Sequence, residues 1–241
     1  MDELERQKLD ALAEFAAGAG HEINNPLAII GGRVQLLLRE IEHPEHRRQL
    51  GVIAAQVKRA YEMIADIRFF ARPPQPEWTV FHLSEELQTL VSEQMPLMAE
   101  AGVTFHTDIV PAEPPMIDSD SVLLHVAVSI LCNNAREAVS QKTEPHKTKP
   151  YTGGTVWLSL SRMNGDWIIA VTDDGPGIAE ETHSLIFDPY YSGREAGRGL
   201  GFGLPKAWRI MQLLGGSIRY APKSTFVLTV PVERQNAPKT A

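Results

Sequence analysis

The segment RPPQPE at residues 72–77 divides the chain into two parts with different hydrophobic patterns. Three of its six residues are proline, which fixes φ and removes a backbone donor, so neither a helix nor a central strand is expected to continue through it. The sequence therefore predicts a linker at 73–77, between a first domain at 1–72 and a second domain at 78–235, with a tail at 236–241.

The first part contains two apolar stripes at helical spacing. One runs through residues 9–41 and the other through 50–71, both in steps of three and four, and EHPE at 42–45 separates them. Two long helices joined by a short loop form an antiparallel hairpin. Because a lone hairpin gives each helix a single neighbour, we expect two copies to pair as a four-helix bundle, which makes the chain a homodimer.

The second part mixes strand-like and helix-like segments. Asn164-Gly165 is typical of a tight hairpin between two strands, Ser84 is a candidate helix cap, and Gly215-Gly216 would stop a helix. The sum predicts an α+β two-layer sandwich with a mixed sheet. Strand patterns lie at 78–83, 103–110, 155–161, 167–173, 217–221 and 225–230, and helical spacing lies at 84–101, 118–138 and 204–214.

The composition excludes several classes of protein. Among 241 residues, 23 Lys and Arg against 30 Asp and Glu give a net charge of −7, which argues against a nucleic-acid partner held by general electrostatics. The single cysteine, Cys132, excludes an internal disulfide and a cysteine cluster for zinc. No apolar run approaches the ~18 residues of a membrane span, and the N-terminus MDELERQKLD is too charged for a signal peptide. We therefore expect a cytoplasmic protein without a membrane span.

The first candidate site is HEINNPL, at residues 21–27 inside the first helical stripe. At about 100° per residue, His21 falls about 160° from the centre of the stripe, and Asn25 falls on nearly the same outward side, with Glu22 beside them. A solvated helix face is the ordinary alternative. Pro26 favours a working site, because a proline inside a helix costs about 3 kcal/mol and is expected to bend it at this cluster.

Two further segments carry side chains suited to a nucleotide. LCNNAREAV holds Asn133 and Asn134, whose amides offer an oxygen to Mg²⁺ or an N–H group to phosphate, although such a pair also caps helices. DDGPGI places Asp173 at the end of an apolar strand, followed by Gly175 and Gly177, which let backbone come close to a ligand. A carboxylate there can accept the amino hydrogens of adenine, and an acidic turn is the alternative.

The fourth segment, GRGLGFGLP at 197–205, has glycines at every second position and leads into a helix. Backbone N–H groups without side chains, next to a helix N-terminus, form a cradle for phosphate oxygens. No GKS or GKT follows, so the segment is not a P-loop, and its spacing is not that of the dinucleotide fingerprint. A flexible loop is the alternative reading.

Taken together and in this order, these segments resemble those of the sensor histidine kinases of two-component signalling. HEINNPL is similar to the phosphoacceptor box of that family, LCNNAREAV to its N box, DDGPGI to its G1 box, IFDPYYSGR to its F box and GRGLGFGLP to its G2 box. The resemblance covers nearly the whole chain. It implies a hairpin for dimerisation and histidine phosphotransfer, followed by an ATP-binding domain of the Bergerat type.

The resemblance also implies a role for each matching residue. His21 would accept the γ-phosphoryl group of ATP, Glu22 would orient the imidazole or take its proton, and Asn25 would help to place a water for dephosphorylating the partner. Asn134 would bind Mg²⁺, and Asp173 would select adenine. The other residues implied at the ATP site are Gly175, Gly177, Ile178, Arg194, Gly199, Leu200, Gly201, Phe202, Gly203 and Leu204.

One position departs from the family pattern. Ile130 stands four residues before Asn134, where the family usually has a second polar N-box residue, and Asn133 is a candidate substitute. The hydrolytic relatives on this fold, gyrases and mismatch-repair ATPases, use a glutamate at that place to activate water, which Ile130 cannot do. The departure keeps two alternatives open: a module that binds nucleotide without catalysis, and, less favoured, an ATP hydrolase.

The leading expectation is an ATP-dependent kinase that phosphorylates His21 and passes the phosphoryl group to an aspartate of a response regulator receiver domain. Transfer within one protomer and transfer across the dimer are both compatible with the sequence. Because the kinase motifs begin about twenty residues from the first residue, the sensory domain is expected to be missing from this chain or supplied by a partner.

Overall fold

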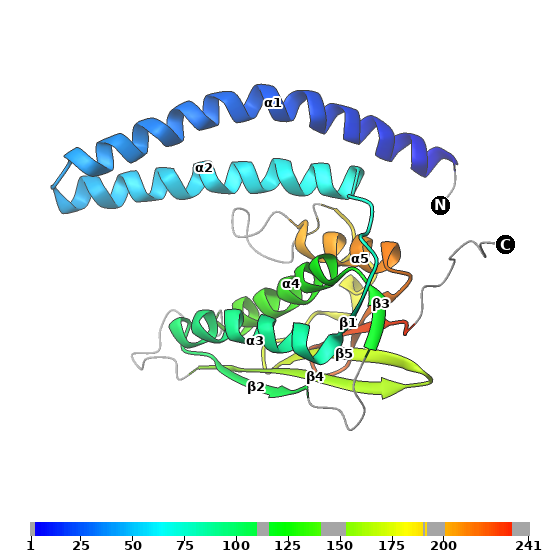
Figure 1. Ribbon diagram of the computed structural model, residues 1–241. Helices are drawn as coiled ribbons and strands as arrows, with labels where there is room; N and C mark the ends of the chain where they lie inside the picture. Colours follow the sequence, from blue (N-terminus) through cyan, green and yellow to red (C-terminus); the bar gives the residue numbers. More distant parts are fainter. Residues whose placement is uncertain (1–2, 110–115, 141–152, 190, 192–200, 233–241) are drawn as a thin grey trace. The chain divides into compact units, whose positions relative to one another are not determined.

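The computed structural model of the chain describes residues 3–109, 116–140, 153–189, 191 and 201–232, with the backbone alone for 3–17, 19 and 21 (Figure 1). The chain forms two compact units. The first contains residues 1–74 and, from later in the chain, Gly201 and Phe202; the second begins at Gln75 and contains the other described residues.

The first unit is the predicted helical hairpin. Helices α1 (Glu3–Glu40) and α2 (Pro44–Ala71) run antiparallel, side by side (Figure 1). Pro44 occupies the first turn of α2, where its missing N–H costs nothing. The Arg47 guanidinium donates hydrogen bonds to the carbonyls of Leu38 and Ile41, which closes the end of α1. The break predicted at 42–45 is therefore a short, well-bonded turn.

Two glycines of α1 allow the helices to approach closely. A Cβ added at Gly20 would lie 3.1 Å from Cγ2 of Ile64, and one added at Gly31 would lie 3.4 Å from Cγ1 of Val57. Gly20 and Val57 are buried, so α1 and α2 pack without a gap along this line.

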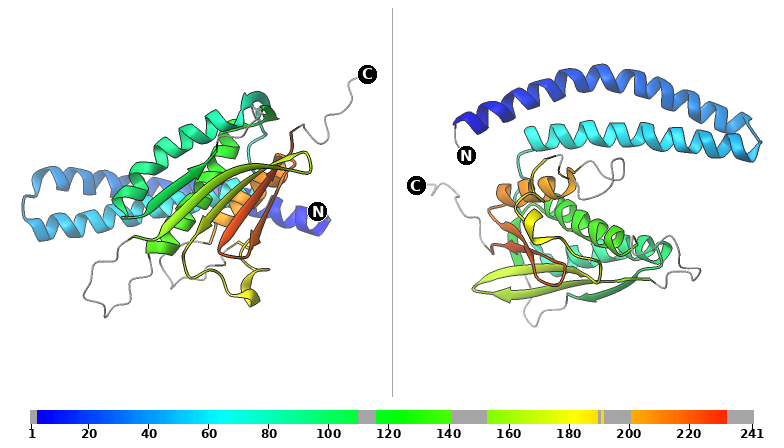
Figure 2. Two further views of the ribbon diagram at one scale, coloured as in Figure 1. Left: turned by 90° about the horizontal axis from the view of Figure 1, so that it is seen from below. Right: turned by 180° about the vertical axis from the view of Figure 1, so that it is seen from behind.

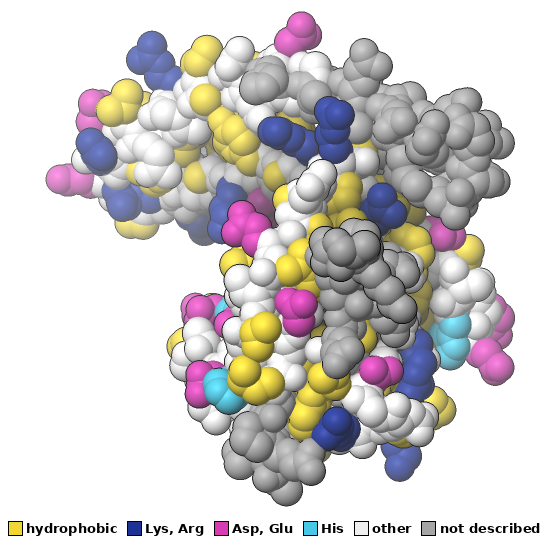
Figure 3. Space-filling model, turned by 45° about the vertical axis from the view of Figure 1, so that its right-hand side comes forward, with side chains coloured by type: hydrophobic (Ala, Val, Ile, Leu, Met, Phe, Trp, Pro, Cys, Tyr) yellow, Lys and Arg dark blue, Asp and Glu magenta, His cyan; other side chains and the backbone are white. Residues whose placement is uncertain are grey.

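Helix α2 does not cover all the apolar side chains of α1. Val34 is buried, but Ile23, Ile30 and Leu37 of the predicted stripe remain 45%, 44% and 41% exposed, and Ile29 is 67% exposed. Hydrophobic side chains are visible among the charged ones on the surface of the hairpin (Figure 3). A single chain therefore leaves the hairpin with an apolar surface still open to solvent.

The second unit is built on a five-stranded sheet in the order β2-β4-β5-β7-β6. The strands are β2 (Thr104–Asp108), β4 (Thr155–Met163), β5 (Asp166–Asp173), β7 (Thr225–Val230) and β6 (Ser217–Ala221). Strand β2 is parallel to β4 and every other pair is antiparallel, which confirms the predicted mixed sheet.

Three helices cover one face of this sheet, which confirms the two-layer α+β prediction (Figure 2). They are α3 (Leu83–Glu100), α4 (Ser121–Ser140) and α5 (Gly203–Leu213). The core consists of large apolar side chains with almost no exposed surface, and it includes Leu87, Leu90, Met98, Leu124, Leu131, Leu158, Ile169, Ile210 and Leu228. A one-turn 3₁₀ helix, η1 (Glu180–Thr182), follows the acidic turn after β5.

A second, two-stranded sheet was not predicted. Strand β1 (Thr79–His82) pairs antiparallel with β3 (Met116–Ser119), with Thr79 opposite Ser119. The predicted helix at 118–138 therefore starts too early, because β3 occupies 116–119 and α4 begins at Ser121. Four residues are too few to show a period, and the pairing that makes them a strand comes from β1, more than thirty residues away in sequence.

The helix cap predicted at Ser84 is wrong. Helix α3 begins at Leu83, its N-cap is His82, and no side chain makes the cap bond. The first turn carries Glu85 and Glu86, whose charges favour the positive end of the helix dipole.

Two predicted turns are confirmed by backbone geometry. Asn164 and Gly165 have φ values of 54° and 93°, as a tight β4–β5 hairpin requires. Gly215 has a φ of 72°, and the N–H of Gly216 donates to the carbonyl of Met211 at 2.9 Å, which ends α5.

Helix α4 is the central helix of the second unit. By length and composition it is the one described helix that could cross a membrane. Eight of its residues, however, are buried in the folded unit: Leu123, Leu124, Ala127, Val128, Leu131, Cys132, Ala135 and Val139. Its apolar character is therefore accounted for by packing inside a folded domain.

Cys132 on α4 is expected to be chemically inert. It is fully buried, and burial raises the pKa of its thiol to about 12, so the reactive thiolate does not form near neutral pH. A thiol reagent such as DTNB should release no colour from the native chain and one equivalent after unfolding in guanidinium chloride. Rapid reaction of the native chain would contradict the buried position.

Candidate functional site

The histidine motif lies in the middle of α1. Helix α1 continues through Pro26, and it curves gently along its length instead of bending at the polar cluster alone (Figure 1). Glu22 and Asn25 are exposed, as their place on the outward side predicts. The side chain of His21 lies outside the described part of the structure, so its outward direction stays a prediction.

The neighbouring helix contributes a hydrogen bond beside this motif. The hydroxyl of Tyr61 on α2 donates to the backbone carbonyl of Asn24 at 3.1 Å. Pro26 has no N–H, so the carbonyl of Glu22 loses its helical partner. Because Pro26 is exposed, water can reach that carbonyl without breaking the helix. Tyr61 was not singled out from the sequence, because nothing local marks which residue of α2 faces Asn24.

The two aspartates of the acidic turn after β5 differ in burial and in hydrogen-bond partner. Asp173 is only 6% exposed, and its Oδ1 accepts a hydrogen bond from the Gly175 N–H at 2.8 Å. A Cβ added at Gly175 would lie 2.4 Å from that same oxygen, so residue 175 must be glycine for the carboxylate to keep its place. The next residue, Asp174, is exposed and tied to β4, because its Oδ1 accepts from the Thr155 N–H at 3.0 Å. Asp173 is therefore the buried aspartate of the pair, at the C-terminal end of β5.

The loop that follows is held by an aromatic residue of β6. Gly177 has a φ of 73°, and the N–H of Ile178 donates to the Tyr220 hydroxyl at 3.1 Å. The ring of His183 stacks edge-on against Tyr220 at 4.8 Å, with one ring nitrogen 3.0 Å from the Ile178 carbonyl. The sequence did not indicate Tyr220 and His183, because each lies in a segment that contains no motif. Both position the segment that contains Gly175, Gly177 and Ile178.

The start of α5 lies against the N-box helix. A Cβ added at Gly203 would be 3.5 Å from Cγ2 of Ile130 and 4.0 Å from Oδ1 of Asn134. Asn134 is half-buried, and its amide oxygen therefore lies beside a helix N-terminus, which carries partial positive charge and free N–H groups. An amide oxygen is a ligand that Mg²⁺ accepts, and helix N–H groups suit phosphate oxygens.

Asn133 is not at this place. Its Oδ1 accepts a hydrogen bond from Nη2 of Arg136 at 3.1 Å, and one residue along a helix turns the side chain by about 100°. The suggestion that Asn133 substitutes for the missing polar residue is therefore disfavoured. The side chain beside Asn134 at the start of α5 is the apolar Ile130.

The glycine-rich segment is described only in its last part. Gly201 has a φ of 68°, Phe202 is buried, and Gly203 and Leu204 open α5. Arg194, Gly199 and Leu200, which the resemblance to histidine kinases also implies at the ATP site, lie outside the described residues.

Comparison with known proteins places both halves of the chain. The family model for the His Kinase A (phospho-acceptor) domain matches residues 11–76, and the model for the histidine kinase-, DNA gyrase B- and HSP90-like ATPase matches residues 119–234. The chain is the catalytic core of a sensor histidine kinase.

Relatives of this histidine kinase core align along almost its whole length. It is 26% identical to sporulation kinase D of Bacillus subtilis over 95% of this chain and 44% of that protein. It is 29% identical to the signal transduction histidine-protein kinase AtoS of Escherichia coli over 95% of this chain and 36% of that protein. The core thus spans less than half the length of these two curated relatives.

Solved structures share the fold of the core. Full-length ShkA in complex with AMPPNP matches 93% of this chain and 47% of its own, with a TM-score of 0.73 and 22% identity. The histidine kinase ThkA in complex with the response regulator protein TrrA matches 94% of this chain and 64% of its own, with a TM-score of 0.66 and 22% identity.

A polar residue at position 130 of this histidine kinase is expected to favour binding of Mg²⁺ beside Asn134. In Ile130→Asn, a second amide oxygen would lie beside Asn134, and hard oxygen ligands favour Mg²⁺. We expect the Mg²⁺ concentration for half-maximal ATP binding to fall several-fold, measured by titration with a fluorescent ATP analogue. Ile130→Val is the matched control, because it adds no ligand. An unchanged Mg²⁺ dependence in Ile130→Asn would show that residue 130 does not reach the ion.

Proposed function

We propose that this core phosphorylates itself on His21 with ATP and passes the phosphoryl group to an aspartate of a response regulator. The observation that carries the proposal is the pairing, in one chain, of a phospho-acceptor domain that contains His21 with an ATPase domain. In the ATPase domain, the buried Asp173 would supply a hydrogen-bond acceptor for adenine, and the half-buried Asn134 would supply a ligand for Mg²⁺. The proposed domains are 1–72 for dimerisation and phosphotransfer, 73–77 for the linker, 78–235 for ATP and 236–241 for the tail.

ATP would be bound beside the C-terminal end of β5, the last turns of α4 and the N-terminus of α5. The carboxylate of Asp173 accepts a hydrogen bond from the amino group at C6 of adenine, where guanine has a carbonyl oxygen and cannot donate. Gly175 and Gly177 leave room for the ring, and Ile178 covers it. Toward the phosphates, the backbone of the glycine-rich segment and the N-terminus of α5 donate N–H groups. The residues assigned to the phosphate side are Arg194, Gly199, Leu200, Gly201, Phe202, Gly203 and Leu204.

Magnesium is the proposed cofactor, and Asn134 is its protein ligand. The amide oxygen of Asn134 fits a hard cation, whereas Ile130 beside it offers no donor, so water and phosphate oxygens would fill the other positions. Bound Mg²⁺ would offset the charge of the phosphates.

The transfer itself is a nucleophilic displacement. A ring nitrogen of His21 forms a bond to the γ-phosphorus, the bond from that phosphorus to the β–γ bridging oxygen breaks, and ADP leaves. Glu22, exposed one residue away, orients the imidazole and accepts the proton that its other nitrogen releases. Asn25 is exposed four residues along the same helix, where it would place a water for dephosphorylation of the response regulator.

The core is proposed to act as a homodimer in the cytoplasm, where ATP is present. The exposed apolar side chains of α1, including Ile23, Ile30 and Leu37, are the surface that a second hairpin would bury in a four-helix bundle. The receiver domain of a response regulator is the proposed partner, and the ThkA–TrrA complex is a precedent on the same fold. Neither nucleic acid nor a membrane span is part of the proposal.

The test is incubation of the chain with γ-labelled ATP and Mg²⁺. A label that acid removes and base leaves in place, and that EDTA prevents, is expected for a phosphohistidine. Nucleotide binding without any label would favour a module that only binds ATP. Continuous release of phosphate without a phosphorylated chain would favour an ATP hydrolase. Either result would overturn the proposal.

A further inference from the structure

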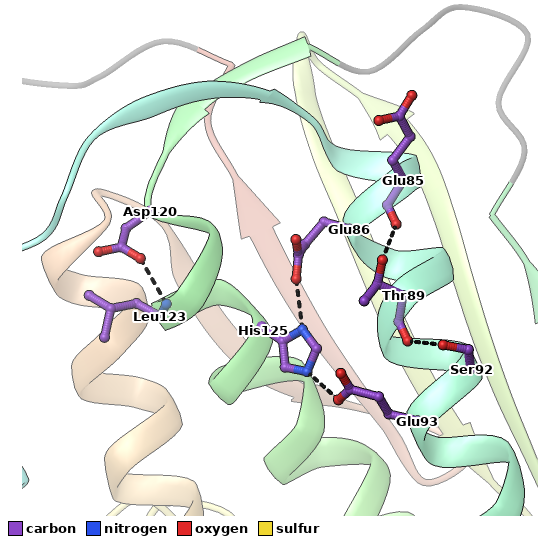
Figure 4. Close-up of polar contacts among 8 residues, drawn as sticks. All are labelled: Glu85, Glu86, Thr89, Ser92, Glu93, Asp120, Leu123 and His125. Carbon is purple, nitrogen blue, oxygen red and sulfur yellow. Dashed lines mark hydrogen bonds and ion pairs between the residues drawn. The ribbon is translucent and has the colours of Figure 1, made fainter.

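The segment after the proline-rich linker is fastened to the start of α4. The carboxylate of Asp120, the residue before α4, accepts two backbone N–H groups: Oδ1 accepts from Leu123 at 2.9 Å and Oδ2 accepts from Glu77 at 2.7 Å. The first is a helix N-cap bond, which is visible in Figure 4. The second reaches 43 residues back along the chain. Asp120 is 6% exposed, so its two bonds are largely shielded from water.

The bond to Glu77 extends the β1–β3 ladder toward the linker. Thr79 pairs with Ser119, the residue directly before Asp120. On the same strand, the N–H of Asp118 donates to the carbonyl of Val232 at 3.3 Å. The carboxylate of Asp120 therefore adds one link to a strand that is already held by two segments distant in sequence.

The first turns of α4 are braced against α3 (Figure 4). Nδ1 of His125 lies 2.7 Å from Oε1 of Glu86, and Nε2 of the same ring lies 2.9 Å from Oε2 of Glu93. Both glutamates belong to α3, so one histidine joins the two helices through both of its ring nitrogens. Asp120 therefore precedes a helix whose first turns are held in place by contacts with α3.

The same helix carries the proposed metal ligand. Asn134 lies 14 residues after Asp120, which is about 21 Å along an α-helix. Helix α4 is one continuous element from Ser121 to Ser140. It therefore holds the end of the linker at its first turn and Asn134 near its last turns.

We propose that Asp120 is a positioning residue for phosphoryl transfer to His21, an inference that rests on the proposed function. The connection between the two units, here called the tether, begins where α2 ends, at the hydrogen bond from the Arg72 N–H to the carbonyl of Arg68 (2.8 Å). It ends at Glu77, because the Glu77–Asp120 bond holds that residue. When that bond is broken, the tether extends to Thr79. The longer tether allows more arrangements of the ATP domain, so a smaller fraction of them presents the γ-phosphate to the histidine.

Three variants separate this bond from the helix cap and from linker stiffness. Asp120→Ser keeps an oxygen that can cap α4 but has no second acceptor for Glu77. Glu77→Pro removes the N–H donor and leaves Asp120 intact. Gln75→Pro is the matched control, because it adds a proline to the same linker at an exposed residue while keeping the Glu77 N–H.

The measurement is the single-turnover rate of labelling by the whole chain. At saturating ATP, we expect Asp120→Ser and Glu77→Pro to slow labelling about three- to tenfold, because misplacement of reacting groups lowers rate more than binding. The KM for ATP should stay at the parent value, and the unfolding temperature should fall by only a few degrees, as expected for the loss of one hydrogen bond to a carboxylate. The double variant should be no slower than either single variant, because both remove the same bond. Gln75→Pro should keep the parent rate.

Several results would overturn the proposal. These are an unchanged rate in both test variants, effects that add in the double variant, a KM that rises as the rate falls, or equal slowing by Gln75→Pro. Amide hydrogen exchange gives a readout that needs no kinase activity: the Glu77 N–H should be protected in the parent chain and lose protection in Asp120→Ser. Absence of that protection rejects the inference, whereas absence of label in the parent chain rejects the proposed function.

Discussion

Replacement of His21 by glutamine is expected to abolish labelling of the chain by γ-labelled ATP. Glutamine fits a helix and keeps a polar side chain, but its amide nitrogen is not a nucleophile, so no phosphoryl bond can form. Since Asp173 and Asn134, the residues proposed for adenine and Mg²⁺, belong to the other unit, binding of ATP should remain at the parent level. The measurement is phosphorylation under single-turnover conditions together with ATP affinity from calorimetry.

The matched control for this experiment is His46→Gln. His46 is an exposed histidine of the same hairpin, near the start of α2, and nothing in the sequence assigns it to phosphotransfer. It should label at the parent rate. Label that persists in His21→Gln would place the phosphoryl group on another residue and reject the assignment of His21.

Replacement of Asp173 by asparagine is expected to weaken ATP binding about 10- to 100-fold, the loss of a charged hydrogen bond in a shielded place. Asp173 is 6% exposed as a residue, and its carboxylate accepts a hydrogen bond from the Gly175 N–H, so the carboxylate is already oriented before the nucleotide arrives. Asparagine has one acceptor oxygen, and if that oxygen keeps the Gly175 bond, an NH₂ group faces adenine. Affinity is measured by calorimetry with ATP and with GTP.

Asp174→Asn is the control for this change. The oxygen of asparagine can still accept the bond from the Thr155 N–H, so the fold of the turn should survive and ATP affinity should stay within a factor of about two. Equal losses in the two variants would mean that negative charge in the turn, and not an acceptor aimed at adenine, accounts for binding. The Asp173 assignment would then be rejected.

Much of the architecture followed from periodicity. The two stripes at helical spacing are α1 and α2, and the Asn164-Gly165 turn joins β4 to β5. These elements are long or carry turn chemistry that acts locally, so a short window of sequence contains their cause. Strand β3 has no such cause in its own four residues, since its partner β1 lies far away in sequence.

The site could be predicted in its composition but not in its contacts. The resemblance implied Asp173 and Asn134, but the sequence did not show what their neighbours Asp174 and Asn133 bind. The structure separates each pair, because Asp174 is bound to Thr155 and Asn133 to Arg136. Tyr220, His183 and Asp120 act through bonds to distant backbone, and such bonds leave no trace in the spacing of residues along the chain.

Because the thiol of Cys132 on α4 is expected to be inert, the chain is suited to site-directed spin labelling. Because Cys132 is the sole cysteine and is shielded from reagents, a cysteine introduced at one surface site of the hairpin and another on the ATP domain could be coupled to spin labels without first removing the native residue. Distance distributions between such labels would report how far the two units travel relative to each other during a catalytic cycle.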